Sequence, residues 1–263
     1  KTDSGLDITY MVDFDTDAGD GAAFGSDENS ITIAGGFGRI VLGMDDDAAD
    51  AYNLDESDLI AEDAAPSVTS ATIGTSSSIS SDDAMKIAYH LPAMGGLTAG
   101  ISHTDRGAAG GTDTTSYGAR YSMDAAGASI TLAYAAVQDE NATQDVDQEN
   151  MGMRIVSGDI SLIISQGGSE SNDEDIENQG ASISYKMPNG MTIGAYTFKS
   201  EDDLDAGEEY SRSGVELQYT IATGLTAVIN VDDYDYKEGG SDASASHVDD
   251  SGTQSKLTIK AAF

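Results

Sequence analysis

The 263-residue chain contains no cysteine and no tryptophan, and only three of its residues are proline. Without cysteine the protein forms no disulfide and has no thiolate for catalysis or metal binding. No run of about 18 apolar residues occurs, so we expect no transmembrane helix. With so few prolines, little in the chain opposes extended strands.

Basic residues are also scarce, because 12 Lys and Arg stand against 47 Asp and Glu, for a formal net charge of −35. Nucleic acids are bound through lysine and arginine contacts to phosphates, so this balance argues against a nucleic-acid partner. High acidity is also found in disordered chains. A hydrophobic content of 39% and a regular apolar pattern favour a folded protein with a solvated acidic surface.

The pattern that is present is an alternation of apolar and polar residues with a period of two. Near the C-terminus, Leu257 and Ile259 fall on one side while Lys256 and Lys260 fall on the other, as in a half-buried β-strand. Similar segments recur at 5–15, 30–35, 37–44, 85–92, 97–105, 116–124, 128–138, 150–157, 159–166, 180–187, 191–199, 212–222, 225–232 and 254–263. The sequence therefore predicts an all-β fold of fourteen strands.

The connections between these segments are alternately short and long. The short ones are tight turns such as AGG, SGD and PNG, whereas the long ones are acidic and rich in Gly and Ser, the longest being 45–84. An up-and-down antiparallel barrel with turns at one rim and loops at the other has this alternation. We therefore expect residues 1–263 to form a single barrel domain.

A barrel of this many strands is too wide for side chains to fill, so its apolar face is expected to point outward into lipid. A strand of ~9 residues, tilted by ~40°, spans roughly 23 Å, close to the apolar band of an outer membrane. Six basic residues have the parity of the polar face: Arg39, Lys86, Arg120, Arg154, Lys186 and Lys260. The pattern thus predicts a transmembrane β-barrel with a water-filled interior.

Three stretches resemble Gram-negative general porins, closest in style to those of alphaproteobacteria. They are TDSGLDITYMVDF, GGFGRIVLGMDDDAADAY and the terminal Phe263. The resemblance implies a homotrimer in the outer membrane of a Gram-negative bacterium, in contact with the lipid bilayer and lipopolysaccharide. It also implies that 45–84 folds into the lumen, that Phe263 is a signal for the assembly machinery, and that an N-terminal hairpin missing from this sequence completes sixteen strands. A complete fourteen-stranded barrel is the alternative.

For such a porin we expect passive diffusion of small hydrophilic solutes and ions, with weak cation selectivity. Carboxylates of the 45–84 loop would face basic residues on the wall and create a transverse field across a constriction. The favoured acids are Asp55, Glu56, Asp58, Glu62 and Asp63. The favoured basic residues are Arg39, Lys86 and Arg120, with Arg154 and Lys186 in reserve. Any one of the acids is as well explained by a role in solvating the loop.

Calcium is the one cofactor that the sequence suggests, at a cluster formed by Asp15, Asp17 and Asp20. The cluster departs from an EF-hand, which would not have Gly19 at its fifth position or Ser26 at its twelfth. The competing interpretation of the whole chain is a secreted, acidic, β-rich surface or adhesion protein stabilised by calcium. It predicts solubility without detergent and no conductance.

An enzyme is disfavoured by the residues present. The three histidines lack the spacing of metal ligands, and no G-x-S-x-G elbow or phosphate-binding loop occurs. We therefore expect the protein not to be an enzyme.

Overall fold

The computed structural model describes residues 5–15, 25–61, 79, 84–105, 111–140, 145–172, 174–204, 207–237 and 249–261. It contains fourteen strands, so the predicted all-β fold is confirmed. The strands are β1 Asp7–Asp15, β2 Gly25–Gly35, β3 Gly38–Met44, β4 Met85–His90, β5 Leu97–Thr104, β6 Asp113–Ala125, β7 Ala128–Glu140, β8 Asp145–Ser157, β9 Ile160–Glu170, β10 Asp175–Lys186, β11 Met191–Asp202, β12 Glu209–Ala222, β13 Leu225–Lys237 and β14 Asp250–Ala261. Two short 3-10 helices, η1 Asp50–Tyr52 and η2 Glu56–Leu59, follow β3.

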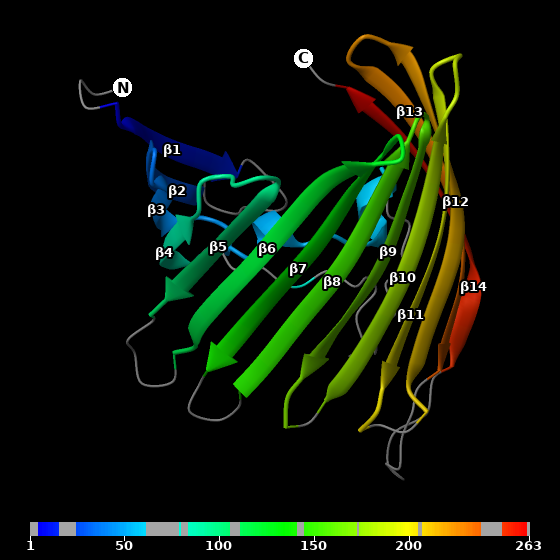
Figure 1. The fold of residues 1–263 in the computed structure, drawn as a ribbon. Helices are drawn as coiled ribbons and strands as arrows, with labels where there is room; N and C mark the ends of the chain where they lie inside the picture. The colour runs from blue at the N-terminus through cyan, green and yellow to red at the C-terminus, as the bar shows by residue number, and fades with distance from the viewer. Residues whose placement is uncertain are drawn as a thin grey trace. The chain divides into compact units, whose positions relative to one another are not determined.

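Every strand pairs with the next one along the chain, as the alternating connections predict (Figure 1). The fourteen strands form one sheet, whose order runs without a crossover from β1 to β14. Hairpin pairing of this kind is antiparallel, and the register between β12 and β13 is typical, with Val215 opposite Val231. Whether a further hairpin brings the count to sixteen stays a prediction.

Most strands are longer than their apolar segments. β8 begins at Asp145 and β10 at Asp175, each five residues before the predicted start, and β13 continues to Lys237. In these extensions acidic residues pair across the ladder, as Glu177 does with Glu201. The ladder continues because its hydrogen bonds use backbone groups alone, whereas apolar alternation is needed only where one face leaves water.

The chain divides into two compact units. Unit 1 comprises Lys1–Asn53, Ile79–Tyr121 and Ala133–Glu149, and it contains β1 to β5, most of β6 and β7, and the start of β8. Across its strands, Ile40 pairs with Tyr89 on one face, and Arg39 pairs with His90 on the other. The register thus separates an apolar face from a polar one, as the parity of the sequence predicts.

Unit 2 comprises Leu54–Ser78, Ser122–Leu132 and Asn150–Phe263. Its apolar face contains the paired residues Val215 and Val231, which are both exposed. On its other face Tyr196 pairs with Gly214, which pairs with the buried Asp232. An aromatic cluster is buried near the loop-side ends of β10 to β13 and consists of Ile176, Phe198, Tyr210 and Tyr236.

Among the described residues, no helix has the length and apolar character needed to cross a membrane. That the 263 residues form a single domain stays a prediction.

Candidate functional site

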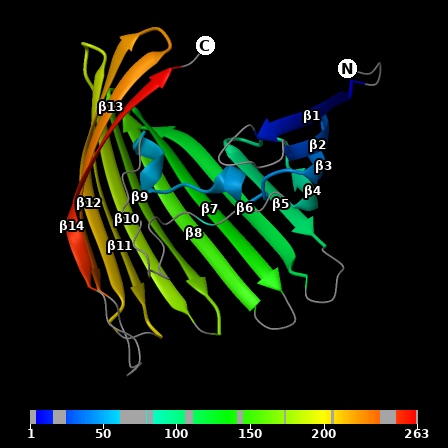
Figure 2. The same cartoon turned by 180° about the vertical axis from the view of Figure 1, so that it is seen from behind.

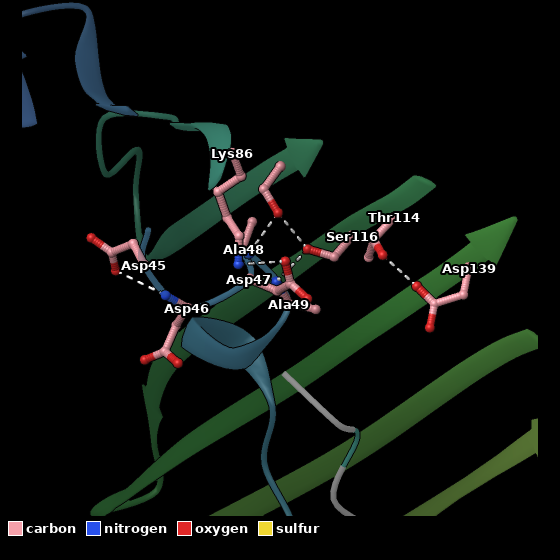
Figure 3. A network of polar contacts seen from close by, with 10 residues as sticks. Asp45, Asp46, Asp47, Ala48, Ala49, Lys86, Thr114, Ser116 and Asp139 are labelled. Atoms are coloured by element: carbon pink, nitrogen blue, oxygen red, sulfur yellow. Dashed lines mark hydrogen bonds and ion pairs between the residues drawn. The ribbon is translucent and has the colours of Figure 1, made fainter. Parts of the chain in front are cut away.

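The connection after β3 is held on the polar face of the sheet by side chains of the wall. In unit 1, the backbone N–H of Ala48 donates to Ser102 Oγ at 3.0 Å, and that of Ala49 donates to Ser116 Oγ at 3.2 Å (Figure 3). The two hydroxyls also contact each other at 2.7 Å. Since Ser102 and Ser116 are buried on β5 and β6, this part of the loop lies along the wall and η1 rests against these two strands (Figure 2).

An ion pair fixes the start of the same segment. Lys86 Nζ lies 2.8 Å from Asp47 Oδ1, and the exposed fractions of the two side chains are 0% and 2%. Two charges removed from water are tolerated when they neutralise each other. Lys86 is on the polar face, as predicted, but its charge is directed to the loop instead of to open solvent.

Tyr52 ends η1 and is seated on two lumen-parity glycines of β5 and β6. A Cβ at Gly118 would lie 2.7 Å from Tyr52 Cβ, and one at Gly100 would lie 3.0 Å from the ring, so larger residues would displace it. The phenol oxygen is 3.0 Å from His90 Nδ1. Burial raises the pKa of Tyr52 above its ordinary value of 10.0, despite the nearby positive charges of Arg39 and Arg120. The phenol therefore stays neutral at physiological pH.

Arg120 closes the part of the loop that belongs to unit 1. Its Nη2 donates to the backbone oxygen of Asn53 at 2.5 Å. Arg120 and Arg39 both lie on the polar face, where Arg120 pairs in register with Thr98 and Arg39 pairs with His90. The three basic residues that the sequence favours thus all belong to the polar face of unit 1.

In unit 2 the loop continues into η2, which Asp55 caps. Asp55 Oδ1 accepts hydrogen bonds from Ser57 N at 2.8 Å and Ser57 Oγ at 2.5 Å. In return, Asp58 Oδ2 accepts a hydrogen bond from Asp55 N at 3.3 Å. This capping box satisfies donors that the start of a helix leaves unpaired. Asp55 is buried and Asp58 is exposed, so only Asp58 presents its side chain to solvent.

Glu56 lies fully buried against β9 and β10, which η2 contacts together with β11 (Figure 2). Ser165 Oγ donates to Glu56 Oε2 at 2.7 Å. The carboxylate lies over Gly180, where a Cβ would be 2.1 Å from Glu56 Oε2. The glycine on the strand leaves the space that the carboxylate fills.

Both ends of the unit 2 segment are also bound to the wall. At its start, Leu54 N donates to Asn150 Oδ1 at 3.3 Å. At its end, Ala61 N donates to Glu216 Oε1 at 2.9 Å, and Lys260 Nζ donates to Ala61 O at 2.6 Å. The loop therefore follows the polar face of β8 to β14 over the whole of its described part in unit 2.

The two reserve residues lie in unit 2. Arg154 is half-buried on β8, and Lys186 ends β10 with an exposed side chain. Lys186 pairs in register with Thr192, which agrees with its predicted polar parity.

The sequence reasoning missed a buried polar group on β11 to β13. Arg212 Cζ lies 5.3 Å from the centre of the Tyr196 ring, within the range of a cation–π contact. Tyr196 in turn donates a hydrogen bond to Asp232, and Glu216 is buried on the same strand as Arg212. The period-two parity of 212–222 was a signal that would have found Arg212 and Glu216.

Several predicted sites lie outside the described residues. They are Glu62, Asp63, Asp17, Asp20 and Phe263. Asp15 ends β1. Within the described ranges, no group of three or more His, Cys, Asp or Glu is arranged to hold a metal ion. The calcium hypothesis and the assembly signal stay predictions.

Comparison with known proteins identifies the family. A family model described as Gram-negative porin matches residues 1–253. The structure is similar to the anion-selective porin from Comamonas acidovorans, with a TM-score of 0.71 and 16% identity over 99% of this chain and 86% of that chain. No curated protein matches the sequence significantly.

Two further solved structures share the fold. They are outer-membrane expressed OmpT of Vibrio cholerae, with a TM-score of 0.67 and 12% identity over 99% of this chain and 86% of that chain, and the outer membrane channel DcaP of Acinetobacter baumannii, with a TM-score of 0.55 and 12% identity over 98% of this chain and 80% of that chain. At these identities the likeness establishes the fold alone.

The resemblance to porins is therefore confirmed, and the secreted surface or adhesion protein is not supported. The alphaproteobacterial type and the absence of enzymatic activity stay predictions. With its fourteen-stranded antiparallel sheet and a porin family match that covers 1–253, the chain belongs to the Gram-negative porin family and is a β-barrel channel protein of the outer membrane of a Gram-negative bacterium.

Proposed function

We propose that the protein lets small hydrophilic solutes and ions diffuse passively through a water-filled pore that the 45–84 loop narrows. The observation that carries this proposal is the attachment of the loop to the polar face. Wall hydroxyls of Ser102 and Ser116 hold the first part of the loop, and Glu216 holds the last described part. A loop bonded along the inner wall occupies space that the pore would otherwise leave to water.

We also propose weak cation selectivity. The net charge of −35 supports an enrichment of cations at the pore mouths, and the exposed loop acids Asp46, Asp50 and Asp58 support it near the constriction. The buried pair of Lys86 with Asp47 removes one cation and one anion together, so it leaves the balance of the remaining charges unchanged. The Comamonas porin is described as anion-selective, which makes selectivity the sharpest point to test.

The test is a recording from planar bilayers that contain the detergent-purified protein, under a gradient of KCl. We expect stable conductance steps and a reversal potential of the sign for potassium preference. The preference should weaken as salt rises, because the Debye length falls from ~10 Å at 0.1 M to ~3 Å at 1 M. A reversal potential for chloride preference would overturn the selectivity, and an absence of conductance would overturn the channel.

A homotrimer is part of the proposal, and strand length supports it. β3, β4 and β5 have 7, 6 and 8 residues, while β6 to β14 have 11 to 14. Strands of 6 to 8 residues, tilted by ~40°, span roughly 16–21 Å, less than the ~25 Å apolar band of an outer membrane. Their outward residues include Leu42, Met85 and Ile87, which are exposed. Two further copies of the chain would cover this side better than lipid does.

Native mass spectrometry from mild detergent tests the assembly. A mass of three chains is expected, together with conductance that closes in three equal steps. A single-chain mass with single closures would contradict it.

Contact with lipid headgroups, including lipopolysaccharide, belongs to the outward face near the long loops. On the outward face of unit 2, Val215 pairs with Val231. The next pair on that face toward the long loops is Ser213 with Asp233. Two positions further on, Lys237 Nζ lies 2.9 Å from Glu209 Oε2. This change from apolar to charged residues supports a membrane boundary at that level.

A further inference from the structure

A cavity of about 320 Å³ lies in unit 1, between the polar face of β1 to β4 and the first part of the loop. Small or uncharged side chains such as Thr9, Thr32 and Ala88 line one part of it. Its charged and titratable lining consists of Arg39, His90, Asp45, Asp46, Asp47 and Asp50. This volume is at the lower end of the ~300–1,000 Å³ of small-molecule sites.

The positive and negative charges that line the cavity come from different parts of the structure. The positive charge is on the strand wall, where Arg39 pairs in register with His90, and the negative charges are on the loop at Asp45, Asp46 and Asp50. Asp47 is already bound to Lys86. Within the described residues, Arg39 makes no ion pair within 4 Å, although it lines the same cavity as these carboxylates.

Local contacts orient groups on both sides of the cavity. Asp45 Oδ1 accepts a hydrogen bond from Asp46 N at 3.0 Å, which orients the Asp45 carboxylate within the loop. His90 is held through Nδ1 by the phenol of Tyr52, so its Nε2 is the ring atom left for another hydrogen bond. The Lys86–Asp47 pair then fixes the loop against β4.

A ligand that satisfies both sides must carry both charges. Arg39 can bind a carboxylate through two parallel N–H donors. The loop carboxylates accept hydrogen bonds from an ammonium group. A lone anion would meet the acids, and a lone cation would meet Arg39. A molecule with adjacent carboxylate and ammonium groups has neither conflict.

We propose that this cavity is a binding site for small zwitterionic α-amino acids, in which Arg39 binds the carboxylate and Asp45, with Asp50, binds the ammonium. The inference rests on the proposed channel function and names a solute class for it. Binding beside the constriction makes the passage of such solutes saturable, unlike free diffusion through a water-filled pore.

The probe is L-alanine, and its control is lactamide, a neutral solute of similar size. Equilibrium binding of ¹³C-labelled alanine to the detergent-purified full chain is measured by NMR, and the reduction of KCl conductance by each solute is measured in bilayers. We expect saturable binding and saturable reduction of conductance by alanine, and only a shallow, linear effect of lactamide. Equal effects of the two solutes, or conductance without alanine binding, would overturn the inference.

Two variants separate the charged groups. Arg39→Gln is expected to weaken alanine binding about tenfold, the size of one lost charge-assisted interaction. Asp45→Asn is expected to weaken alanine binding but to strengthen the binding of lactate, which lacks the ammonium. A purely structural effect of the substitution would weaken both. Lys199→Gln, on the outward face, is the matched control and should leave alanine binding unchanged.

The outcomes for the two proposals are distinct. Alanine binding to a protein that shows no conductance would overturn the channel proposal and support this site. Conductance with no discrimination between alanine and lactamide would overturn the site and leave the channel standing.

Discussion

Lys86 Nζ and Asp47 Oδ1 lie 2.8 Å apart, and almost none of either side chain is exposed to solvent. One residue belongs to β4 and the other to the connection after β3, so this ion pair joins the strand wall to that loop. Because neither charge has access to water, removing one partner is costly: the remaining charge is left buried without its counter-charge.

Lys86→Gln is expected to destabilise the protein by about 3–5 kcal/mol, since it leaves the Asp47 carboxylate buried without its counter-charge. Urea unfolding in detergent measures this loss. Far-UV circular dichroism reports the transition, because the chain has no tryptophan for fluorescence. The double variant Lys86→Gln/Asp47→Asn should recover much of it, because no buried charge remains unpaired. If the single variant unfolds at the same urea concentration as the wild type, the ion pair does not hold the loop.

Gly152→Ala is expected to displace the loop, because a Cβ at Gly152 would lie 2.1 Å from the backbone oxygen of Leu54. Backbone cannot rotate away as a long side chain can, so the overpacking should cost ~1–3 kcal/mol. Under the proposed constriction, the displaced loop should also change the single-channel conductance. Gly36→Ala is the control, because nothing lies within 4 Å of its added Cβ. Equal conductance of both variants would contradict the close contact.

Ser165→Ala removes the hydroxyl that donates to Glu56 Oε2 at 2.7 Å. Glu56 is fully buried, so the loss of one hydrogen bond to its carboxylate should cost about 1–3 kcal/mol. Urea unfolding measures the cost. Adding Glu56→Gln should reduce it, because a neutral amide is less costly to bury than a carboxylate. Additive losses in the double variant would show that the two side chains act independently.

Stability should depend on pH through Tyr52, whose pKa burial raises above its ordinary value of 10.0. The unfolded chain loses the phenol proton first, so this contribution to stability is complete below pH 10 and declines as pH rises through the higher pKa of the folded state. Tyr52→Phe removes that decline. The urea midpoint, measured between pH 8 and pH 11.5, should therefore fall less steeply in the variant, and identical slopes would contradict the assignment.

The strands followed from the sequence because alternation is a local property. Every second residue of a strand lies on the same face. The apolar Ile259 and the charged Lys260 therefore indicate which face is which, without any information on residues distant in sequence. The same logic failed at the strand ends. At Asp145 and Glu177 the exposed face carries acidic residues, so the apolar alternation of that face ends while the backbone ladder continues.

The capping of η2 also depends only on residues close together in the sequence. Asp55 precedes Asp58 by three residues, which is a capping-box spacing, and the structure has both hydrogen bonds. From the sequence we expected these acids to act on the pore, and the sequence contains no distinction between an acid that caps a helix and one that faces a solute.

The sequence by itself determined the all-β fold, the order of the strands, the polar face that carries Arg39 and Lys86, and the unusual length of the connection after β3. Only the tertiary structure decided which of 47 acidic residues meets which base, that Glu56 and Asp47 are buried, and that Gly152 and Gly180 make room for the loop. The physical reason is the distance in sequence between the residues that interact. Alternation reflects contact with solvent and repeats along the chain, whereas an ion pair or a close backbone contact depends on distances between residues far apart in sequence, such as the 2.7 Å between Ser165 and Glu56.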